Sequence, residues 1–306
     1  MATITTSTYG SSNKKLFNPE LTTELFNKVK GASTLAKLSG SEPIPFSGLD
    51  VFTFSMDGEA SIVGEGQNKP AGEAEFGKVT IAPLKVVYQH RLTDEFVHLA
   101  NEKRLPYMRA FTDGFSKKIA RAVDIMGFHG VNPATGTASA LIGTNHFDAA
   151  VTATVTYDAA QPDENIDSAV QVIQTAGGDI SGIAMNPAFG AALGAMKASG
   201  TGLPIYPDYR FGGNPGNFGG LRADINNTVS FGAASSVASK DRALVGDFAK
   251  AFRWGYAEQI TFEVIRFGDP DGLGDLKRMN QVCLRSEAYI GWGILDPASF
   301  ARIVTA

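Results

Sequence analysis

The segment "GEGQNKPAGEAEF", Gly64 to Phe76, is too polar and too rich in glycine to belong to a protein core. It lies between "VFTFSM" and "KVTIAPLKVVYQHRLT", whose alternating side chains predict two β-strands. The pattern therefore predicts a hairpin with a charged tip, and Pro83 places the return strand at a sheet edge. Because a two-stranded hairpin is marginally stable alone in water, this one needs a partner surface.

The overall composition is that of a globular chain of one large or two ordinary domains. Its 306 residues are 43% hydrophobic and carry a net charge of -4. This charge excludes a surface coated with basic residues for sequence-specific nucleic-acid binding. Cys283 is the single cysteine and is expected to be a buried thiol in a protein made in a reducing cytoplasm. No apolar run approaches the about 18 residues of a membrane span, so no membrane partner is expected.

The pattern of apolar residues changes along the chain. The first 45 residues lack sustained periodicity, apart from a short amphipathic helix predicted to end at Gly31, and predict an arm that lies on another surface. A long helix is predicted over about 104–129, where apolar residues recur at a spacing of three to four. Short helices and strands alternate over about 160–250, and long strands follow over about 257–288. Two lobes are therefore expected.

The sequence contains no recognisable constellation for catalysis or metal binding. None of the four histidines forms an H-x-x-x-H pair: His90, His98, His129 and His146. "FGGNPGNFGG" lacks a lysine and follows no βαβ pattern, so it predicts a surface loop rather than a phosphate site. "DPDGLGD", residues 269–275, lacks the ligand spacing of a calcium loop and predicts a hairpin turn. We therefore expect no catalytic residue, no metal and no cofactor.

Five segments in the same order resemble the major capsid proteins of tailed bacteriophages, the Hong Kong 97 type. They are "VGEGQNKPAGEAEFGKVTIAPLKVVYQHRLTDEF", "AVDIMGFHG", "SGIAMNPAFGAALGAMKASG", "RALVGDFAKAFRWGYAEQITFEVI" and "AYIGWGILDPASFARI". The similarity begins at about residue 16 and covers nearly the whole remaining chain. It implies an α+β Hong Kong 97-like capsid fold, in which the hairpin is the extended loop that projects over a neighbouring subunit.

The resemblance also implies how the chain is divided. The implied parts are an N-terminal arm (1–45), the extended loop hairpin (46–85), a discontinuous peripheral domain with the long spine helix (86–159 and 251–306) and an axial domain (160–250). The tip of the axial domain, around Gly212 to Gly220, is expected near a symmetry axis.

The function implied by the resemblance is that of a shell protein. Copies would assemble as hexamers and pentamers into an icosahedral capsid around packaged double-stranded DNA, after synthesis in the cytoplasm of the bacterial host. Separate scaffolding, portal and decoration proteins are further partners. Contact with DNA is expected to be non-specific, and the candidate cations lie on the arm and the long helix: Lys14, Lys15, Lys117, Lys118 and Arg121. The alternative for these residues is a solvated helix face.

Two other functions remain open from the sequence. An encapsulin shell protein has the same fold but typically begins with a helix that docks a cargo peptide, whereas "MATITTSTYGSSNKK" is polar and unhelical. A small-oligomer α/β enzyme is the alternative from a different class. Some capsid proteins begin with a scaffold-like segment that a protease removes, but here the arm starts close to Met1. This indicates a separate scaffold, no scaffold or a processed chain, and Met1 argues against the last.

The resemblance further names three candidates for a covalent crosslink. Some members of the family join subunits by an isopeptide bond, in which a lysine on the extended loop attacks an asparagine amide of a neighbour and a glutamate assists. The corresponding positions are Lys69, Asn280 and Glu287. The reaction needs an unprotonated amine, which burial in an apolar interface would favour. The other interpretation is non-covalent docking with Lys69 in an ion pair, and it is the one we expect.

Overall fold

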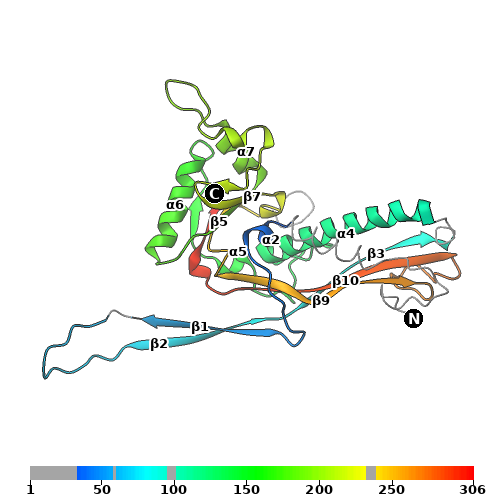
Figure 1. Cartoon of the computed structure of the whole chain (residues 1–306), viewed down its shortest axis with the longest axis horizontal. Helices are drawn as coiled ribbons and strands as arrows, with labels where there is room; N and C mark the ends of the chain where they lie inside the picture. Colours follow the sequence, from blue (N-terminus) through cyan, green and yellow to red (C-terminus); the bar gives the residue numbers. More distant parts are fainter. Residues whose placement is uncertain (1–32, 58–59, 95–100, 232–238) are drawn as a thin grey trace.

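The computed structural model of the chain describes residues 33–57, 60–94, 101–231 and 239–306. Figure 1 shows an upper lobe of short helices and strands, a long layer in which one helix lies along a sheet, and a projecting hairpin. The mixture of helix and sheet confirms the predicted fold class. The predicted helix that ends at Gly31 lies outside the described residues.

The projecting part is an antiparallel hairpin of β1 (Leu49–Asp57) and β2 (Glu73–Ile81). Phe54 lies opposite Phe76 in its register. Of the glycine-rich segment, residues 64–72 lie beyond the strand ends, whereas Glu73 to Phe76 belong to β2. The alternating sequence therefore located β1 and the inner part of β2, whose outer residues were expected in the charged tip.

The predicted return strand is in fact two strands. Pro83 separates β2 from β3 (Leu84–Thr93), and the two strands belong to different sheets. Because proline has no N–H group to continue a ladder, it marks the point where the chain leaves one sheet and enters the next. The expectation that Pro83 lies within one edge strand was wrong.

The long layer consists of α4 (Asn101–His129) and a three-stranded antiparallel sheet in the order β3-β10-β9. The other two strands are β9 (Phe252–Ile265) and β10 (Gln281–Ile294). Aromatic side chains fill the space between helix and sheet, and the rings of Phe115 and Phe262 lie 6.0 Å apart. The predicted long helix is confirmed and begins a few residues earlier than expected.

The upper lobe contains a six-stranded mixed sheet in the order β4-β11-β8-β5-β7-β6. Its strands are β4 (Thr154–Thr156), β5 (Gly182–Met185), β6 (Asn217–Phe218), β7 (Leu221–Ile225), β8 (Asp241–Gly246) and β11 (Phe300–Val304). The helices α6 (Pro162–Thr175) and α7 (Pro187–Ala195) pack with it around a second core that includes Ile173, Phe189 and Val245. Asn186 caps α7 as its sequence predicts, because its side chain accepts the Phe189 N–H at 2.7 Å.

The six-stranded sheet does not follow the predicted domain borders. β4 and β11 come from 86–159 and 251–306, the two segments assigned to the peripheral domain, yet both pair within the upper sheet. Such short strands have no partner close in sequence, and their own alternation does not reveal which sheet they join.

Short helices connect these elements: α2 (Thr34–Leu38), α5 (Phe147–Ala150) and the 3-10 helices η1 (Pro207–Gly212), η2 (Asn227–Val229) and η3 (Pro297–Ser299). Cys283 is completely buried on β10, which confirms its expected role as a small core residue. Within the described part of the chain, no helix combines the length and the apolar character that crossing a bilayer requires.

Candidate functional site

One face of the hairpin carries four exposed apolar residues in its outer part, beyond the ion pair between Asp50 and Lys78. Because side chains alternate along a strand, Phe52, Phe54 and Met56 of β1 point the same way, and the register places Phe76 of β2 beside them. These four residues are 74%, 56%, 73% and 77% exposed in that order, and the rings of Phe54 and Phe76 lie 4.9 Å apart. An exposed apolar cluster of this kind marks a surface that another molecule covers. We call these four residues the hairpin face.

The opposite side of the hairpin contacts its own subunit near the root. Val51, Thr53 and Val79 are half-buried there, and Ile81 at the end of β2 is completely buried. Farther out along β2, Glu75 is exposed. The hairpin is therefore fixed at its root, whereas its outer part presents side chains to solvent.

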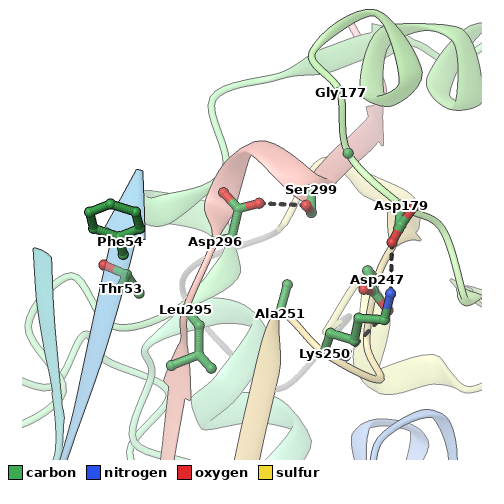
Figure 2. A pocket seen from close by; sticks show the side chains of 11 residues that line it. Thr53, Phe54, Gly177, Asp179, Asp247, Lys250, Ala251, Leu295, Asp296 and Ser299 are labelled. Atoms are coloured by element: carbon green, nitrogen blue, oxygen red, sulfur yellow. Dashed lines mark hydrogen bonds and ion pairs between the residues drawn. The ribbon is translucent and has the colours of Figure 1, made fainter. Parts of the chain in front are cut away.

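A cavity of about 590 Å³ opens between the hairpin and the body of the subunit. Figure 2 shows Phe54 on the hairpin side and the polar residues of the body across from it. Lys250 Nζ lies 2.8 Å from Asp179 Oδ2, and the Ser299 hydroxyl donates to Asp296 at 2.5 Å. On the side of the body, the polar lining consists of Asp179, Asp247, Asp296, Lys250 and Ser299. The cavity is a cleft at the hairpin root, and its polar groups are paired within the subunit.

Asp124 on α4 holds the start of α2. Its fully buried carboxylate accepts the backbone N–H groups of Thr34 at 3.0 Å and Leu35 at 3.2 Å. The hydroxyls of Ser33 and Thr228 also donate to it. Burial raises the pKa of Asp124 to about 6, against the lowering effect of these hydrogen bonds. The start of α2, which lies within the predicted arm, is thus fixed to the long helix.

Asp224 on β7 holds the same short helix from the upper lobe. The Thr34 hydroxyl donates to Asp224 at 2.6 Å, and Lys37 Nζ lies 2.5 Å from its other oxygen. Asn214 donates to Asp224 at 3.0 Å. Since Asp124 belongs to the long layer and Asp224 to the upper lobe, α2 joins the two.

A second buried network joins the end of α4 to β8 and β11. His129 Nδ1 lies 2.8 Å from Asp148 Oδ2, and His129 Nε2 lies 2.8 Å from the carbonyl oxygen of Thr228. The guanidinium of Arg302 lies 3.0 Å from Asp148 and 2.9 Å from Asp241. Both ring nitrogens of His129 therefore face acceptors, which only the doubly protonated ring satisfies.

These contacts set the pKa values of the network. Burial by itself would lower the pKa of His129, but the hydrogen bond to Asp148 raises it above its ordinary value. Burial would raise the pKa of Asp148, yet the hydrogen bond from His129 lowers it to about 2. Burial and the adjacent Asp148 raise the pKa of Asp241 to about 7. His129, Asp148 and Asp241 each offer a ligand atom within 4.8 Å of the others, but Arg302 already supplies the cation. The cluster is an ion-pair network rather than a metal centre.

The "DPDGLGD" segment forms the turn between β9 and β10, as its sequence predicts. Arg91 on β3 donates from Nε to both oxygens of Asp271 at 2.9 Å, from NH2 to Asp269 at 3.0 Å, and to the Gly274 carbonyl at 2.8 Å. The guanidinium thus holds both aspartates and the backbone of this turn together. Phe267 and Leu273 remain largely exposed on this loop.

The structure separates the three crosslink candidates within one subunit. Lys69 is exposed in the hairpin tip, whereas Asn280 directly precedes β10 at the opposite end of the long layer (Figure 1). Glu287 lies seven residues farther along β10, about 23 Å at the rise of an extended strand. Its carboxylate lies 2.8 Å from Lys85 Nζ. A reaction among the three candidates would require residues from different copies.

The candidate DNA contacts differ in their availability. Lys117 and Lys118 are exposed on α4. Arg121 instead donates to Asn227 Oδ1 at 3.0 Å and lies 5.5 Å from the ring centre of Phe231, so it is engaged inside the subunit. Lys14 and Lys15 lie outside the described residues.

The anchoring acids were not predicted from the sequence. Asp124 interrupts the apolar run "AVDIMGF" of the long helix. An acid within a buried stripe indicates a partnered carboxylate, because an unpaired buried charge is costly. His129 was treated as an isolated histidine, and only the fold brings Asp148, Asp241 and Arg302 to it.

The chain matches known proteins over almost its whole length. The phage capsid family model covers residues 15–305. A solved structure from Mycobacterium phage Ogopogo is 32% identical with a TM-score of 0.79, and the match covers 90% of this chain and 92% of that one. A structure from Gordonia phage Cozz is 28% identical with a TM-score of 0.72, covering 90% and 86% of the two chains. The capsid of a native GTA particle shares the fold at 16% identity and a TM-score of 0.60, covering 89% and 90%. No curated protein sequence matches closely enough to count as a relative.

The fold is that of a protein class that builds shells. It combines a projecting hairpin, a long helix along a sheet and a separate lobe. The chain belongs to the phage capsid family. It is a structural protein of the virion, a major capsid protein of the tailed-phage type, and copies of it build the shell. The encapsulin and small-oligomer enzyme alternatives are not favoured.

Proposed function

We propose that the hairpin face is the contact by which each subunit holds a neighbouring copy in the shell. The observation that carries this proposal is the exposure of four large apolar side chains on one side of the hairpin. Burying each of them would contribute about 1.5–3 kcal/mol before the cost of association is subtracted. In a shell made of this chain, the surface available to cover them belongs to a second copy.

The proposed contact joins unlike surfaces of two copies. The outer part of the hairpin projects beyond the rest of the subunit (Figure 1), so it reaches away from its own body. Head-to-tail contacts form rings when the rotation between copies closes. We propose hexameric and pentameric rings that together build an icosahedral shell around double-stranded DNA. The loop from Gly212 to Gly220 lies near the ring axis in this arrangement, next to Phe211, which is 98% exposed.

The two lobes are the peripheral and axial domains in this proposal. The long layer of α4 and β3-β10-β9 is peripheral, and the six-stranded sheet is axial. β4 and β11 are assigned to the axial domain because they pair in its sheet. The arm, residues 1–45, and the extended loop, residues 46–85, keep the borders that the sequence predicts.

The proposed contact between copies is non-covalent. Glu287 already pairs with Lys85 of its own subunit at 2.8 Å. Mature particles boiled in detergent are expected to give a single band near 32.4 kDa. Larger species that disappear in Lys69→Ala would instead establish the isopeptide bond.

Packaged DNA and other assembly proteins are the further partners in this proposal. Lys117 and Lys118 face the DNA and bind it without sequence preference, so the affinity of the subunit for duplex DNA falls steeply with salt. Sequence-specific binding that persists at high salt would contradict this assignment. Separate scaffolding, portal and decoration proteins complete the particle, which assembles in the bacterial cytoplasm.

Substitutions in the hairpin face test the central proposal. Phe54→Ser and Phe76→Ser are expected to leave the circular dichroism spectrum of the subunit unchanged, because both side chains are exposed. In sedimentation and negative-stain images, both variants should lose particles and accumulate as free subunits or small oligomers. Leu141→Ser is the matched control, since Leu141 is 84% exposed outside the hairpin. Normal particle yield from both phenylalanine variants would refute the proposal.

A further inference from the structure

The β9–β10 ladder carries three glycines on one face, at the place where the hairpin joins the subunit. Gly255 lies opposite Gly291 in the register, and Gly293 follows two residues later on β10. Trp254 and Trp292 lie opposite one another between them and are buried. Because side chains alternate along each strand, the tryptophans lie on one face of this ladder and the three glycines leave the backbone bare on the other. We call Gly255, Gly291 and Gly293 the glycine saddle.

Both limbs of the hairpin pass over the glycine saddle. The chain that leads into β1 runs beside β9, where the Glu42 N–H donates to the Trp254 carbonyl at 2.9 Å and the Ile44 N–H donates to the Tyr256 carbonyl at 3.1 Å. The chain that leaves β2 crosses at Ile81, which is 0% exposed. The root of the hairpin therefore lies directly on the backbone of the sheet.

The glycine saddle has no space for side chains. A Cβ atom on Gly255 would lie 1.6 Å from the Glu42 carbonyl oxygen, and one on Gly291 would lie 3.1 Å from Ile81 Cγ2. A Cβ atom on Gly293 would lie 2.8 Å from Ile81 Cγ1. None of the three glycines has a positive φ angle. The positions therefore require glycine for close approach and not for an unusual backbone conformation.

We infer that the glycine saddle sets the direction in which the hairpin leaves the subunit. This direction in turn determines where the hairpin face meets the neighbouring copy. The second part rests on the proposed function. A nine-residue strand is about 30 Å long, so a tilt of about 10° at its root moves its far end by about 5 Å. Such a displacement exceeds what a packed interface accommodates, because close-packed surfaces are sensitive to a change as small as one methylene group. Gly255, Gly291 and Gly293 are thus positioning residues for assembly.

The direction of the hairpin is measured within one subunit. Spin labels are placed on cysteines introduced at Glu75 of β2 and Leu141 of the body, both exposed, while the native Cys283 is completely buried. Dilute labelled protein is mixed with excess unlabelled subunit, so that only distances within a subunit contribute. Gly293→Ala is expected to shift the main distance by several ångström. Gly72→Ala is the control, because a Cβ atom there meets nothing within 4 Å.

A second substitution separates direction from general damage. Ile81→Ala removes the atoms that a Cβ on Gly293 would meet, so Gly293→Ala combined with Ile81→Ala should return the distance toward that of Ile81→Ala alone. Circular dichroism melting verifies that each variant is folded. Gly255→Ala meets backbone rather than a side chain and should give the largest shift or fail to fold. Folded Gly293→Ala and Gly291→Ala proteins with unshifted distances would overturn the inference.

Particle yield then distinguishes the inference from the proposed function. Gly293→Ala is expected to lower the yield severalfold in sedimentation, and Gly72→Ala is expected to leave it unchanged. A shifted distance with a normal yield would uphold the directional role of the glycine saddle and refute docking by the hairpin face. An unshifted distance would refute the directional role whatever the yield.

Discussion

The carboxylate of Asp124 lies 3.0 Å from the backbone nitrogen of Thr34, which is 90 residues away in the sequence. The first N–H groups of a helix have no partner within the helix, and Asp124 supplies one for α2 from the middle of α4. Its negative charge also suits the positive end of the helix dipole. The long helix therefore fixes the start of α2.

Removing this carboxylate should destabilise the subunit. Asp124→Ala leaves the buried N–H groups of Thr34 and Leu35 without an acceptor, which should lower the free energy of unfolding by about 2–4 kcal/mol. Urea unfolding of unassembled subunits measures the change. Lys117→Ala on the exposed side of the same helix is the control and should have little effect. A loss no larger than that of the control would contradict the anchoring role.

The stability of the subunit should fall as the pH rises toward neutrality. The pKa of Asp241 is raised from 3.8 to about 7 in the folded protein, so the folded state holds this proton more tightly than the unfolded state. The contribution is complete below pH 4 and is lost as the pH rises through about 7. The raised pKa values of Asp124 and His129 act in the same direction.

Asp241→Asn isolates the share of Asp241 in this pH dependence. The amide stays neutral beside Asp148 at every pH, while His129 and Arg302 remain in place. The difference in melting temperature between pH 5 and pH 8 should therefore be smaller in Asp241→Asn than in the unmodified protein. Glu75→Gln, at an exposed position on the hairpin, should keep the full difference. If the difference in melting temperature were unchanged in Asp241→Asn, the buried pair of Asp148 and Asp241 would not titrate between pH 5 and pH 8.

Arg91 should determine the order of the β9–β10 turn. Arg91→Lys keeps the charge but loses the fork that contacts both oxygens of Asp271. Amide exchange over residues 268–275 should become about 10-fold faster or more, which corresponds to a loss of about 1.4 kcal/mol. The β3-β10-β9 ladder should keep its protection. Arg278→Lys, an exposed position in the same loop, is the control, and equal exchange in both variants would count against Arg91 as the organiser.

Assembly should protect the hairpin more than any other described part. Free capsomers are expected to exchange amides quickly over about residues 54–82, since few contacts of their own hold the outer strands. In shells the same amides should be protected by the neighbouring copy, while α4 changes little. Equal protection of the hairpin in both states would show that docking does not order it.

The elements that the sequence predicted well are those whose pattern is local. Alternation located β1 and the inner part of β2, and the apolar stripe located α4, because each pattern repeats within one element. The break at Pro83 was missed, since the strands on both sides continue the same alternation. The place of β11 and the partners of Asp124 depend on residues more than 50 positions away in sequence. No local pattern carries that information.

The position of β11 also has a consequence during protein synthesis. β11 lies between β4 and β8, so the six-stranded sheet remains in two pieces until residues 300–304 have been made. At about 5–20 residues per second, β4 waits roughly 7–30 s for its partner strand. A chain still attached to the ribosome therefore has an unfinished lobe.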